Sequence, residues 1–329
     1  MRRLFSLWVA SMVGTIVTLL GLSLIAARNV PASLLAVEVD SRILRVDIAR
    51  GMAVDISPDD TLQYRSPTWA PDGTRLAFFG RRPDAPTQIF VLDMTTEILH
   101  TYNAHAEFND TLQWAPDGRH LLFVAENADP RRHDNEAALL QLSSGDVRLL
   151  TSVGYIFHPT LSPDGHWLTY RSRSDVFIAS AQTSEWHRVI DNGFSFAESW
   201  SDDSATLSLI LHGYQPDLPS SSIALYEPQA GVDILHCTQI PPNGYAQWSP
   251  SRRYVATHIT GIGLVVADFT TCERIFTHHE ISQAVPHWLN NRTLMFASDN
   301  VLYHADIFTG MLHSFELDGR INSLNHNGF

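Results

Sequence analysis

The chain has 329 residues, of which 44% are apolar and 17% charged, so it can bury one large core or two ordinary ones. Acidic residues exceed basic residues by 35 to 22, and every basic residue is an arginine. The missing lysine excludes chemistry that needs an amine nucleophile, and the acidic balance lacks the basic stripe that nucleic-acid binding requires. Two cysteines are too few for a disulfide scaffold or for a zinc site made of thiolates alone.

The first segment, residues 1–27, is typical of a transmembrane anchor or a signal segment. Two arginines precede an uncharged stretch, Leu4–Ala27, of 24 residues, and about 20 residues suffice for a helix to cross a bilayer. We expect an uncleaved transmembrane helix; cleavage after Ala27 or Ala32 is the alternative, because small residues precede both positions. Positive residues stay on the cytoplasmic side, so we expect the rest of the chain to be extracytoplasmic, either periplasmic or at the cell surface.

A repeated motif runs through residues 34–329, which we take as one domain behind a stem at 28–33. It consists of a small or polar residue, a tryptophan, Ala or Ser, and Pro-Asp-Gly, as in TWAPDG at 68–73. Successive anchor positions lie 39 to 48 residues apart, and such a period with several short strands per unit indicates a β-propeller. Pro-Asp-Gly favours a tight turn, so each anchor should end an inner strand and wedge between blades. The six anchors are Trp69, Trp114, Leu161, Trp200, Trp248 and Trp288.

The number of outer hairpins predicts seven blades rather than six. The missing inner strand is found at the C-terminus, where RINSLNHNG at 320–328 mirrors RSPTWAPDG at 65–73, with Leu324 at the anchor position. At the other end of the domain, residues 34–39 fit the strand that should pair with it. We therefore predict an all-β, seven-bladed β-propeller, preceded by the N-terminal transmembrane helix. Pairing of N- and C-terminal strands closes the ring, which leaves no inner sheet edge open.

These repeats resemble the TolB-like, WD40-like (PD40-type) propeller repeats, which also occur in the propellers of prolyl oligopeptidases and dipeptidyl peptidases. The resemblance covers essentially all of residues 34–329. It implies a propeller fold and, from the TolB family, a periplasmic interaction protein. TolB proteins combine six blades with a separate N-terminal domain, whereas we expect seven blades and no counterpart of that domain here. The motif encodes a turn and a wedge, so it is specific for fold and not for function.

Catalytic and metal motifs give little support to an enzyme. The G-x-S-x-G pentapeptide of the peptidase relatives does not occur in the sequence. Three histidines precede inner strands and two are adjacent, but none has the spacing of a metal motif. These are His105, His158, His287, and the pair His278 and His279. We therefore expect no metal and no cofactor.

The residue just before each anchor is polar in all seven blades. We predict that these residues form a ring near a wet central channel, where they hydrate the inner strands or line a ligand site. The ring comprises Thr68, Gln113, Thr160, Ser199, Gln247, His287 and Ser323.

The two faces of the ring should differ. The Pro-Asp-Gly turns and outer hairpin turns lie on one face, here called the bottom face, and the long, irregular loops lie on the other, the top face. Arginines and aromatic residues, which interface cores enrich, gather in the top-face segments. The top-face candidates are Arg81, Arg82, Phe108, Arg131, Arg132, Tyr155, Phe157, Phe194, Phe196, Tyr214 and Tyr245.

The stem and the cysteines give two geometric expectations. Six stem residues span at most about 20 Å and join the closing blade at its bottom, so the bottom face should face the membrane. Cys237 is expected at the upper end of an outer strand and Cys272 in the next blade's lower turn. Strands of about six residues separate those ends by roughly 20 Å, whereas a disulfide needs Cα atoms within about 7 Å. We therefore expect unpaired thiols.

The sequence favours a membrane-tethered, non-enzymatic propeller that binds an extracytoplasmic protein, peptide or glycan through its top face. The alternative is a propeller-type lyase or glycosidase with a site at the channel mouth. The paired carboxylates that glycosidases use would come from different blades and have no local sequence motif.

Overall fold

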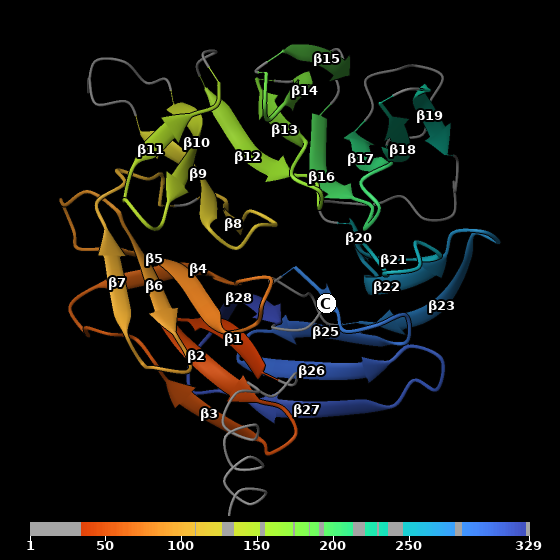
Figure 1. Cartoon of the computed structure of the whole chain (residues 1–329). Helices are drawn as coiled ribbons and strands as arrows, with labels where there is room; N and C mark the ends of the chain where they lie inside the picture. Colours follow the sequence, from red (N-terminus) through yellow and green to blue (C-terminus); the bar gives the residue numbers. More distant parts are fainter. Residues whose placement is uncertain are drawn as a thin grey trace, which may run out of the picture.

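The computed structural model describes residues 34–108, 110–126, 135–151, 155–173, 175–183, 185–190, 194–212, 221–228, 230–235, 246–279 and 285–326. These residues form seven four-stranded antiparallel sheets, which Figure 1 shows arranged in a ring. The predicted seven-bladed β-propeller is confirmed. Within this described part, no helix is long and apolar enough to cross a membrane. The predicted transmembrane helix and stem, residues 1–33, lie outside it.

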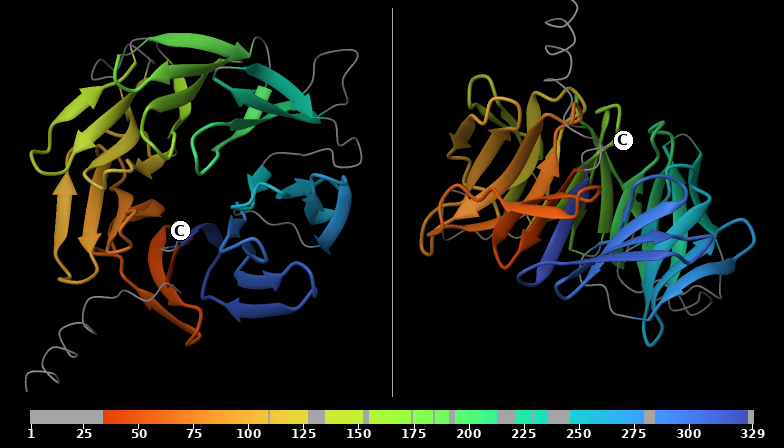
Figure 2. Two further views of the ribbon diagram at one scale, coloured as in Figure 1. Left: turned by 45° about the vertical axis from the view of Figure 1, so that its right-hand side comes forward. Right: turned by 90° about the horizontal axis from the view of Figure 1, so that it is seen from below.

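Each blade has an inner strand followed by three strands of increasing distance from the ring axis, and the inner strands of most neighbouring blades contact one another (Figure 2). From blade 1 to blade 7, the inner strands are β28 (Ile321–His326), β4 (Gln63–Trp69), β8 (Leu112–Trp114), β12 (Ile156–Leu161), β16 (Phe194–Trp200), β20 (Ala246–Trp248) and β24 (His287–Trp288). The second strands are β1 (Leu34–Val39), β5 (Arg75–Arg81), β9 (His120–Glu126), β13 (Trp167–Ser172), β17 (Leu207–His212), β21 (Tyr254–Ile259) and β25 (Thr293–Ser298).

The outer hairpins complete the blades in the same order. The third strands are β2 (Arg42–Asp47), β6 (Gln88–Asp93), β10 (Asn135–Gln141), β14 (Asp175–Ser180), β18 (Ser221–Glu227), β22 (Gly263–Asp268) and β26 (Val301–Asp306). The fourth strands are β3 (Met52–Asp55), β7 (Leu99–Tyr102), β11 (Val147–Leu149), β15 (Trp186–Ile190), β19 (Gly231–Leu235), β23 (Glu273–His278) and β27 (Leu312–Glu316). This order puts the turns from first to second strand and from third to fourth strand on the bottom face.

Four of the tryptophan anchors pack between blades as predicted, because Trp69, Trp114, Trp200 and Trp288 are buried in clusters that include the preceding blade. Trp248 is half-buried and packs with residues of its own blade 6. The turns that follow have the predicted chemistry: in blade 2 the Asp72 carboxylate accepts a hydrogen bond from the Thr74 N–H at 2.9 Å. Gly73 completes that turn with a φ of 66°, which only glycine adopts without strain.

Two anchors also connect neighbouring blades through their indole nitrogens. Trp114 donates its Nε1–H to the Thr68 carbonyl of blade 2 at 3.0 Å. Trp288 donates in the same way to the Gln247 carbonyl of blade 6 at 2.9 Å. In both cases the acceptor belongs to the residue just before the anchor of the preceding blade. The repeat therefore provides both the apolar wedge and a polar link between blades.

The ring closes by the predicted pairing of the two ends of the domain. β28 pairs antiparallel with β1, so that Leu324 lies opposite Val37 and His326 opposite Leu35. Figure 1 shows β28 beside β1 although nearly the whole propeller separates them in sequence. Leu324, Val37 and Leu35 join one core cluster with residues of blade 7. No covalent connection is needed at this seam, because the strand ladder and the shared core hold it together.

The cysteine prediction is wrong, because Cys272 is disulfide-bonded. The sequence contains one other cysteine, Cys237, which lies outside the described residues. The prediction assumed that Cys237 is held at the end of an outer strand. β19 ends at Leu235, so the separation estimated from strand length does not apply.

Candidate functional site

The seven predicted ring residues lie one per blade on the inner strands, and all are half-buried. Two of them make side-chain bonds that hold strands together. The Gln113 amide spans the gap to blade 4, where its Oε1 accepts from the Leu161 N–H at 2.9 Å. The Ser323 hydroxyl donates to a Glu38 carboxylate oxygen at 3.1 Å. These two side chains are therefore partly occupied by structural bonds.

Several inner strands bulge near their upper ends, and among the described residues the bulge is largest in blade 3. In blade 2 the register of β4 against β5 shifts between Arg65 and Thr68, and β12 has the same irregularity in blade 4. In blade 3, Ala106 pairs with Ala125 and Leu112 with Phe123, so the stretch 107–111 stands opposite one residue. Asn109 in this stretch lies outside the described residues. The enlarged bulge brings polar side chains to the upper ends of the inner strands.

Phe108, in this bulge, supports two arginines from blade 2. The Arg81 guanidinium carbon lies 4.3 Å from the Phe108 ring centroid, and that of Arg65 lies 5.3 Å from it. Both distances are within cation–π range. Phe108 itself is only 1% exposed. It therefore positions cations and does not offer a surface of its own.

Three carboxylates surround the same bulge. Burial raises the pKa of Glu107, and the nearby charges of Glu126 and Asp110 raise it further, while Arg81 opposes them. A nearby cation stabilises the ionised form of a carboxylate whose neighbours are also acidic, because its attraction offsets the repulsion between the like charges. The site thus combines an arginine from blade 2 with a concentration of acid from blade 3.

Asp110 connects this group to blade 4. Its Oδ1 accepts a hydrogen bond from the His158 backbone N–H at 3.0 Å, and the His158 Nδ1 lies 3.7 Å from the same oxygen. His158 sits in the bulge of β12 with a φ of 48°, a left-handed conformation uncommon for residues other than glycine. The contact fixes the relative position of the two bulges.

Aromatic residues complete the arrangement on blade 4. Tyr155, just before β12, is 48% exposed. Its ring packs edge-on against the half-buried Phe157, with centroids 5.3 Å apart. These contacts connect blades 2, 3 and 4 near the upper ends of their inner strands, and we call the group the mouth patch. It comprises Arg81, Glu107, Phe108, Asp110, Glu126, Tyr155, Phe157 and His158.

The structure thus brings four of the predicted top-face candidates together: Arg81, Phe108, Tyr155 and Phe157. Arg82 lies apart from them, in an ion pair with Asp59 at 3.2 Å. Phe194 and Phe196 are on β16, but their side chains are not among those described. The remaining candidates fall outside the described residues: Arg131, Arg132, Tyr214 and Tyr245.

Sequence reasoning missed the acidic members of the patch. Glu107, Asp110 and Glu126 are separated along the chain and match no motif. The one available signal was the length of the link between β7 and the Trp114 anchor, because an extra loop is needed there. Among the described residues, no three or more His, Cys, Asp or Glu side chains are placed to hold a metal ion.

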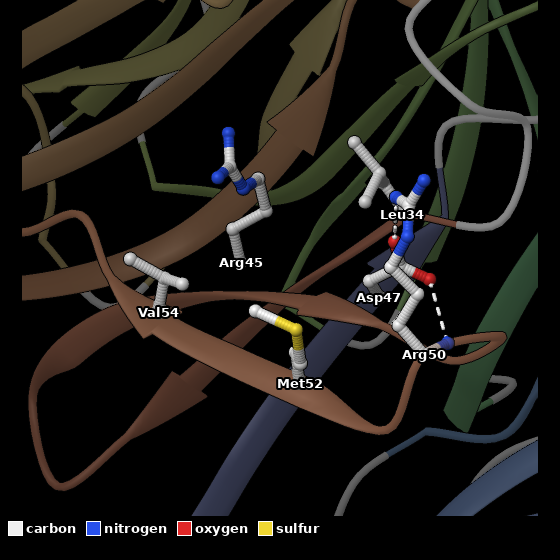
Figure 3. A pocket seen from close by; sticks show the side chains of 6 residues that line it. All are labelled: Leu34, Arg45, Asp47, Arg50, Met52 and Val54. Carbon is white, nitrogen blue, oxygen red and sulfur yellow. Dashed lines mark hydrogen bonds and ion pairs between the residues drawn. The ribbon is translucent and has the colours of Figure 1, made fainter.

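A pocket lies away from the mouth patch, on the sheet of blade 1. It has a volume of about 210 Å³ and lies beside Leu34, the first residue of β1, and the β2–β3 turn (Figure 3). Within it, the Arg50 guanidinium is paired with the Asp47 carboxylate at 2.7 Å. The described lining residues are Leu34, Arg45, Asp47, Arg50, Met52 and Val54.

Comparison with known proteins supports the fold. No family model matches the chain. Among solved structures, the chain is similar to TolB from Acinetobacter baumannii, with 15% sequence identity and a TM-score of 0.55. The similarity covers 90% of this chain and 66% of the TolB chain, so this chain spans less than two thirds of that structure. At this identity the likeness shows a TolB-like propeller fold and nothing finer.

Proposed function

We propose that this chain is a membrane-tethered, extracytoplasmic binding module, and that its propeller binds a protein partner through the mouth patch. The observation that carries this proposal is the convergence of three blades on one group of mixed charge and aromatic rings, in which Glu126, Tyr155 and His158 are exposed. Arg81 contributes a cation, blade 3 contributes three carboxylates, and Tyr155 contributes an exposed ring. Aromatic residues and arginine are enriched in the energetically important centres of protein interfaces.

The choice of a protein over a glycan or a short peptide rests on the charge pattern and the extent of the patch. Both signs of charge occur within it, and the partner would need complementary groups spread across three blades. Such spaced complementarity suits a folded protein surface, where charges determine orientation and specificity. Glycan or peptide binding is therefore the outcome that would contradict this part of the proposal.

The disulfide at Cys272 supports an extracytoplasmic location. Disulfides persist in oxidising compartments and are rare in the cytosol. The uncharged stretch Leu4–Ala27 after two arginines supports a tether with the same orientation. These two features are independent of the mouth patch, so localisation and binding can be tested separately.

The binding proposal is tested by photo-crosslinking on the full-length chain in membranes of its host. A benzophenone amino acid at Glu126, which is exposed, should capture one protein reproducibly. The variant Tyr155→Ala should reduce that capture several-fold, because it removes the exposed ring of the patch. Trp186→Ala is the matched control, since Trp186 is 52% exposed on the outer strand of blade 4. Equal capture by both variants, or transfer of the label to glycans alone, would refute the proposal.

A further inference from the structure

The turns between third and fourth strands are built to one pattern, which allows them to be compared position by position. In four blades the residue that begins the turn donates its backbone N–H to the carbonyl five residues later. The distances are 2.9 Å from Asp93 to Ile98, 2.8 Å from Gln141 to Asp146, 2.8 Å from Ser180 to Glu185 and 2.9 Å from Asp306 to Met311. In blades 1 and 6 the corresponding residues pair across the strands, Asp47 with Met52 and Asp268 with Glu273. All six turns lie on the bottom face.

The residue at the end of this turn divides the ring into two sectors. In blades 7, 1 and 2, which are consecutive around the ring, it is Met311, Met52 and Ile98, and these side chains are 58%, 54% and 52% exposed. In blades 3, 4 and 6 it is an exposed carboxylate, Asp146, Glu185 or Glu273. The blade 5 equivalent, Val232, has a side chain outside those described. Single exposed apolar residues are ordinary, but here they share one structural position in three adjacent blades.

The tip of the blade 7 turn strengthens the apolar sector. Phe308 is 53% exposed there, and its ring packs edge-on against Tyr254 of blade 6, with centroids 5.4 Å apart. Blades 2, 3, 4 and 6 have polar residues at the same position, namely Thr95, Ser143, Gln182 and Thr270. A large aromatic ring at an exposed turn tip costs solubility unless another surface covers it.

The apolar sector is centred on the point where the domain is joined to its N-terminal segment. Leu34 begins β1 in blade 1, at the bottom face, and it lines the blade 1 pocket together with Met52. Only residues 28–33 separate it from the uncharged stretch Leu4–Ala27, and six residues reach at most about 20 Å. If that stretch spans a bilayer, the bottom of blade 1 is held near its surface, with blades 7 and 2 on either side.

The blade 1 pocket adds the charge that a lipid surface requires. Arg45 lies beside Met52 and Val54 there, and the Arg50 guanidinium, which pairs with Asp47, lies next to Leu34 (Figure 3). Arginine binds phosphate groups well and can extend from an apolar surface to a charged one. The exposed carboxylates of blades 3, 4 and 6 would be repelled by an anionic membrane; blade 2 also carries one exposed acid, Glu97, directly before Ile98.

We infer that the bottom sector of blades 7, 1 and 2 lies on the surface of a phospholipid bilayer. Met311, Met52, Ile98 and Phe308 enter the headgroup region, the arginines of the blade 1 pocket meet lipid phosphates, and the acid-bearing blades point away. This inference rests on the proposed function, because it assumes the membrane tether. It adds the orientation of the domain relative to the membrane. It leaves the top face, with the mouth patch, open to a partner.

The test uses the full-length chain in vesicles of phosphatidylcholine and phosphatidylglycerol. A benzophenone amino acid replaces Met52, Ile98 or Met311 in one set, and Asp146, Glu185 or Glu273 in a matched set at the equivalent position. After irradiation, lipid adducts are quantified by mass spectrometry of the labelled peptides. We expect several-fold more lipid adduct in the first set than in the second. Equal yields in the two sets, or adducts to a second copy of the chain, would overturn the inference.

Two further measurements separate docking from mere tethering. Vesicle flotation of every sample reports the tether: a chain that does not float refutes the tether of the proposed function, whereas a chain that floats without lipid adducts refutes only the docking. Benzophenone at Phe308 is then compared with and without the triple variant Met52→Ser, Ile98→Ser, Met311→Ser, whose exposed positions leave the core intact. Docking requires the Phe308 lipid adduct to fall several-fold in the triple variant, and an unchanged yield would overturn it.

Discussion

Blades 1 and 2 have the same four-strand plan but are assembled differently. Blade 2 uses one continuous stretch, from Gln63 to Tyr102, whereas blade 1 takes β28 from the end of the propeller and β1–β3 from its start. Both inner pairings have an irregularity in register near the top. The sheet therefore forms equally well whether its inner strand is a sequence neighbour or comes from the far end of the domain.

The two blades differ in how the inner strand is held. Blade 2 has a buried tryptophan at its anchor, while blade 1 has the smaller Leu324. Blade 1 compensates with polar side chains: Glu38 accepts from the Ser66 N–H and the Ser323 hydroxyl, both at 3.1 Å. Asn325 accepts from the Trp69 N–H at 3.1 Å. The non-covalent seam of blade 1 is therefore held to blade 2 by specific hydrogen bonds, at the cost of burying a carboxylate.

The seam also has an entropic cost that blade 2 does not have. Ser323 and Glu38 are 285 residues apart in sequence, and closing a flexible loop of that length costs about 5 kcal/mol. The rest of the ring reduces this cost once it has folded, because it already holds the two ends near each other. We therefore expect the seam to be the first part of the ring to open.

The largest effect is expected from deleting the strand that closes the ring. A chain ending at Gly319 loses β28, exposes the inner edge of β1 and removes the buried Leu324. The loss should exceed about 5 kcal/mol, which is the whole stability of many domains. Thermal unfolding by circular dichroism should show no cooperative transition, and size-exclusion chromatography should show aggregates. A monomer with the melting temperature of the full chain would contradict the closure argument.

Two leucines at equivalent anchor positions allow a matched test. Leu324→Ala in blade 1 and Leu161→Ala in blade 4 each remove a buried side chain, so both should cost about 3 kcal/mol in urea unfolding. Only Leu324→Ala should also speed hydrogen exchange of the β28 amides, because local opening begins at the seam. Equal exchange of β28 in both variants would mean that the seam is no weaker than the other blades.

Sequence was a good guide to the blades and a poor guide to the contacts between them. The Trp-x-Pro-Asp-Gly repeat is local, because one wedge and one turn specify each inner corner, and so the blade count and the tail pairing followed from it. Glu38, the bulge at Glu107 and the bonding of Cys272 depend on residues brought together from different blades or links. A lone acid in the apolar strand LLAVEV was the available signal for Glu38, and the contact partner could not be read from it.

The hydrogen bonds at the seam are tested by removing their acceptor, the Glu38 carboxylate. Glu38 is 5% exposed, so Glu38→Ala leaves the Ser66 N–H and the Ser323 hydroxyl without their acceptor inside the seam. We expect a loss of about 2 kcal/mol in urea unfolding, the cost of leaving such groups unsatisfied. Glu38→Gln keeps an oxygen that can accept both bonds and removes the buried charge, so it should not share this loss. Equal losses in the two variants would show that the hydrogen bonds do not matter.

The charge of Glu38 gives a pH dependence of known sign. Burial raises its pKa above the ordinary 4.5, and this outweighs the bonds from Ser66 and Ser323 and the attraction of Arg65, which lower it. Folding therefore favours the protonated form, so ionisation of Glu38 lowers the stability of the protein at neutral pH, and this loss disappears as pH falls through the raised pKa towards 4.5. Glu38→Gln should therefore be more stable than wild type at pH 7, and this difference in stability should shrink near pH 4.5. Urea unfolding of both proteins at the two pH values measures it, and an advantage that grows on acidification would reverse the sign.

The smallest effect on stability is expected from substitutions of the anchor tryptophans in blades 2 and 3. The Trp114 Nε1–H donates to the Thr68 carbonyl, whereas the buried Trp69 Nε1 has no hydrogen-bond partner among the described residues. Trp114→Phe and Trp69→Phe remove similar apolar area, but only the first also breaks a bond between blades. We expect Trp114→Phe to cost about 1 kcal/mol more in urea unfolding, the net value of a typical hydrogen bond. If Trp69→Phe is as costly, the indole hydrogen bond contributes nothing measurable to the contact between blades 2 and 3.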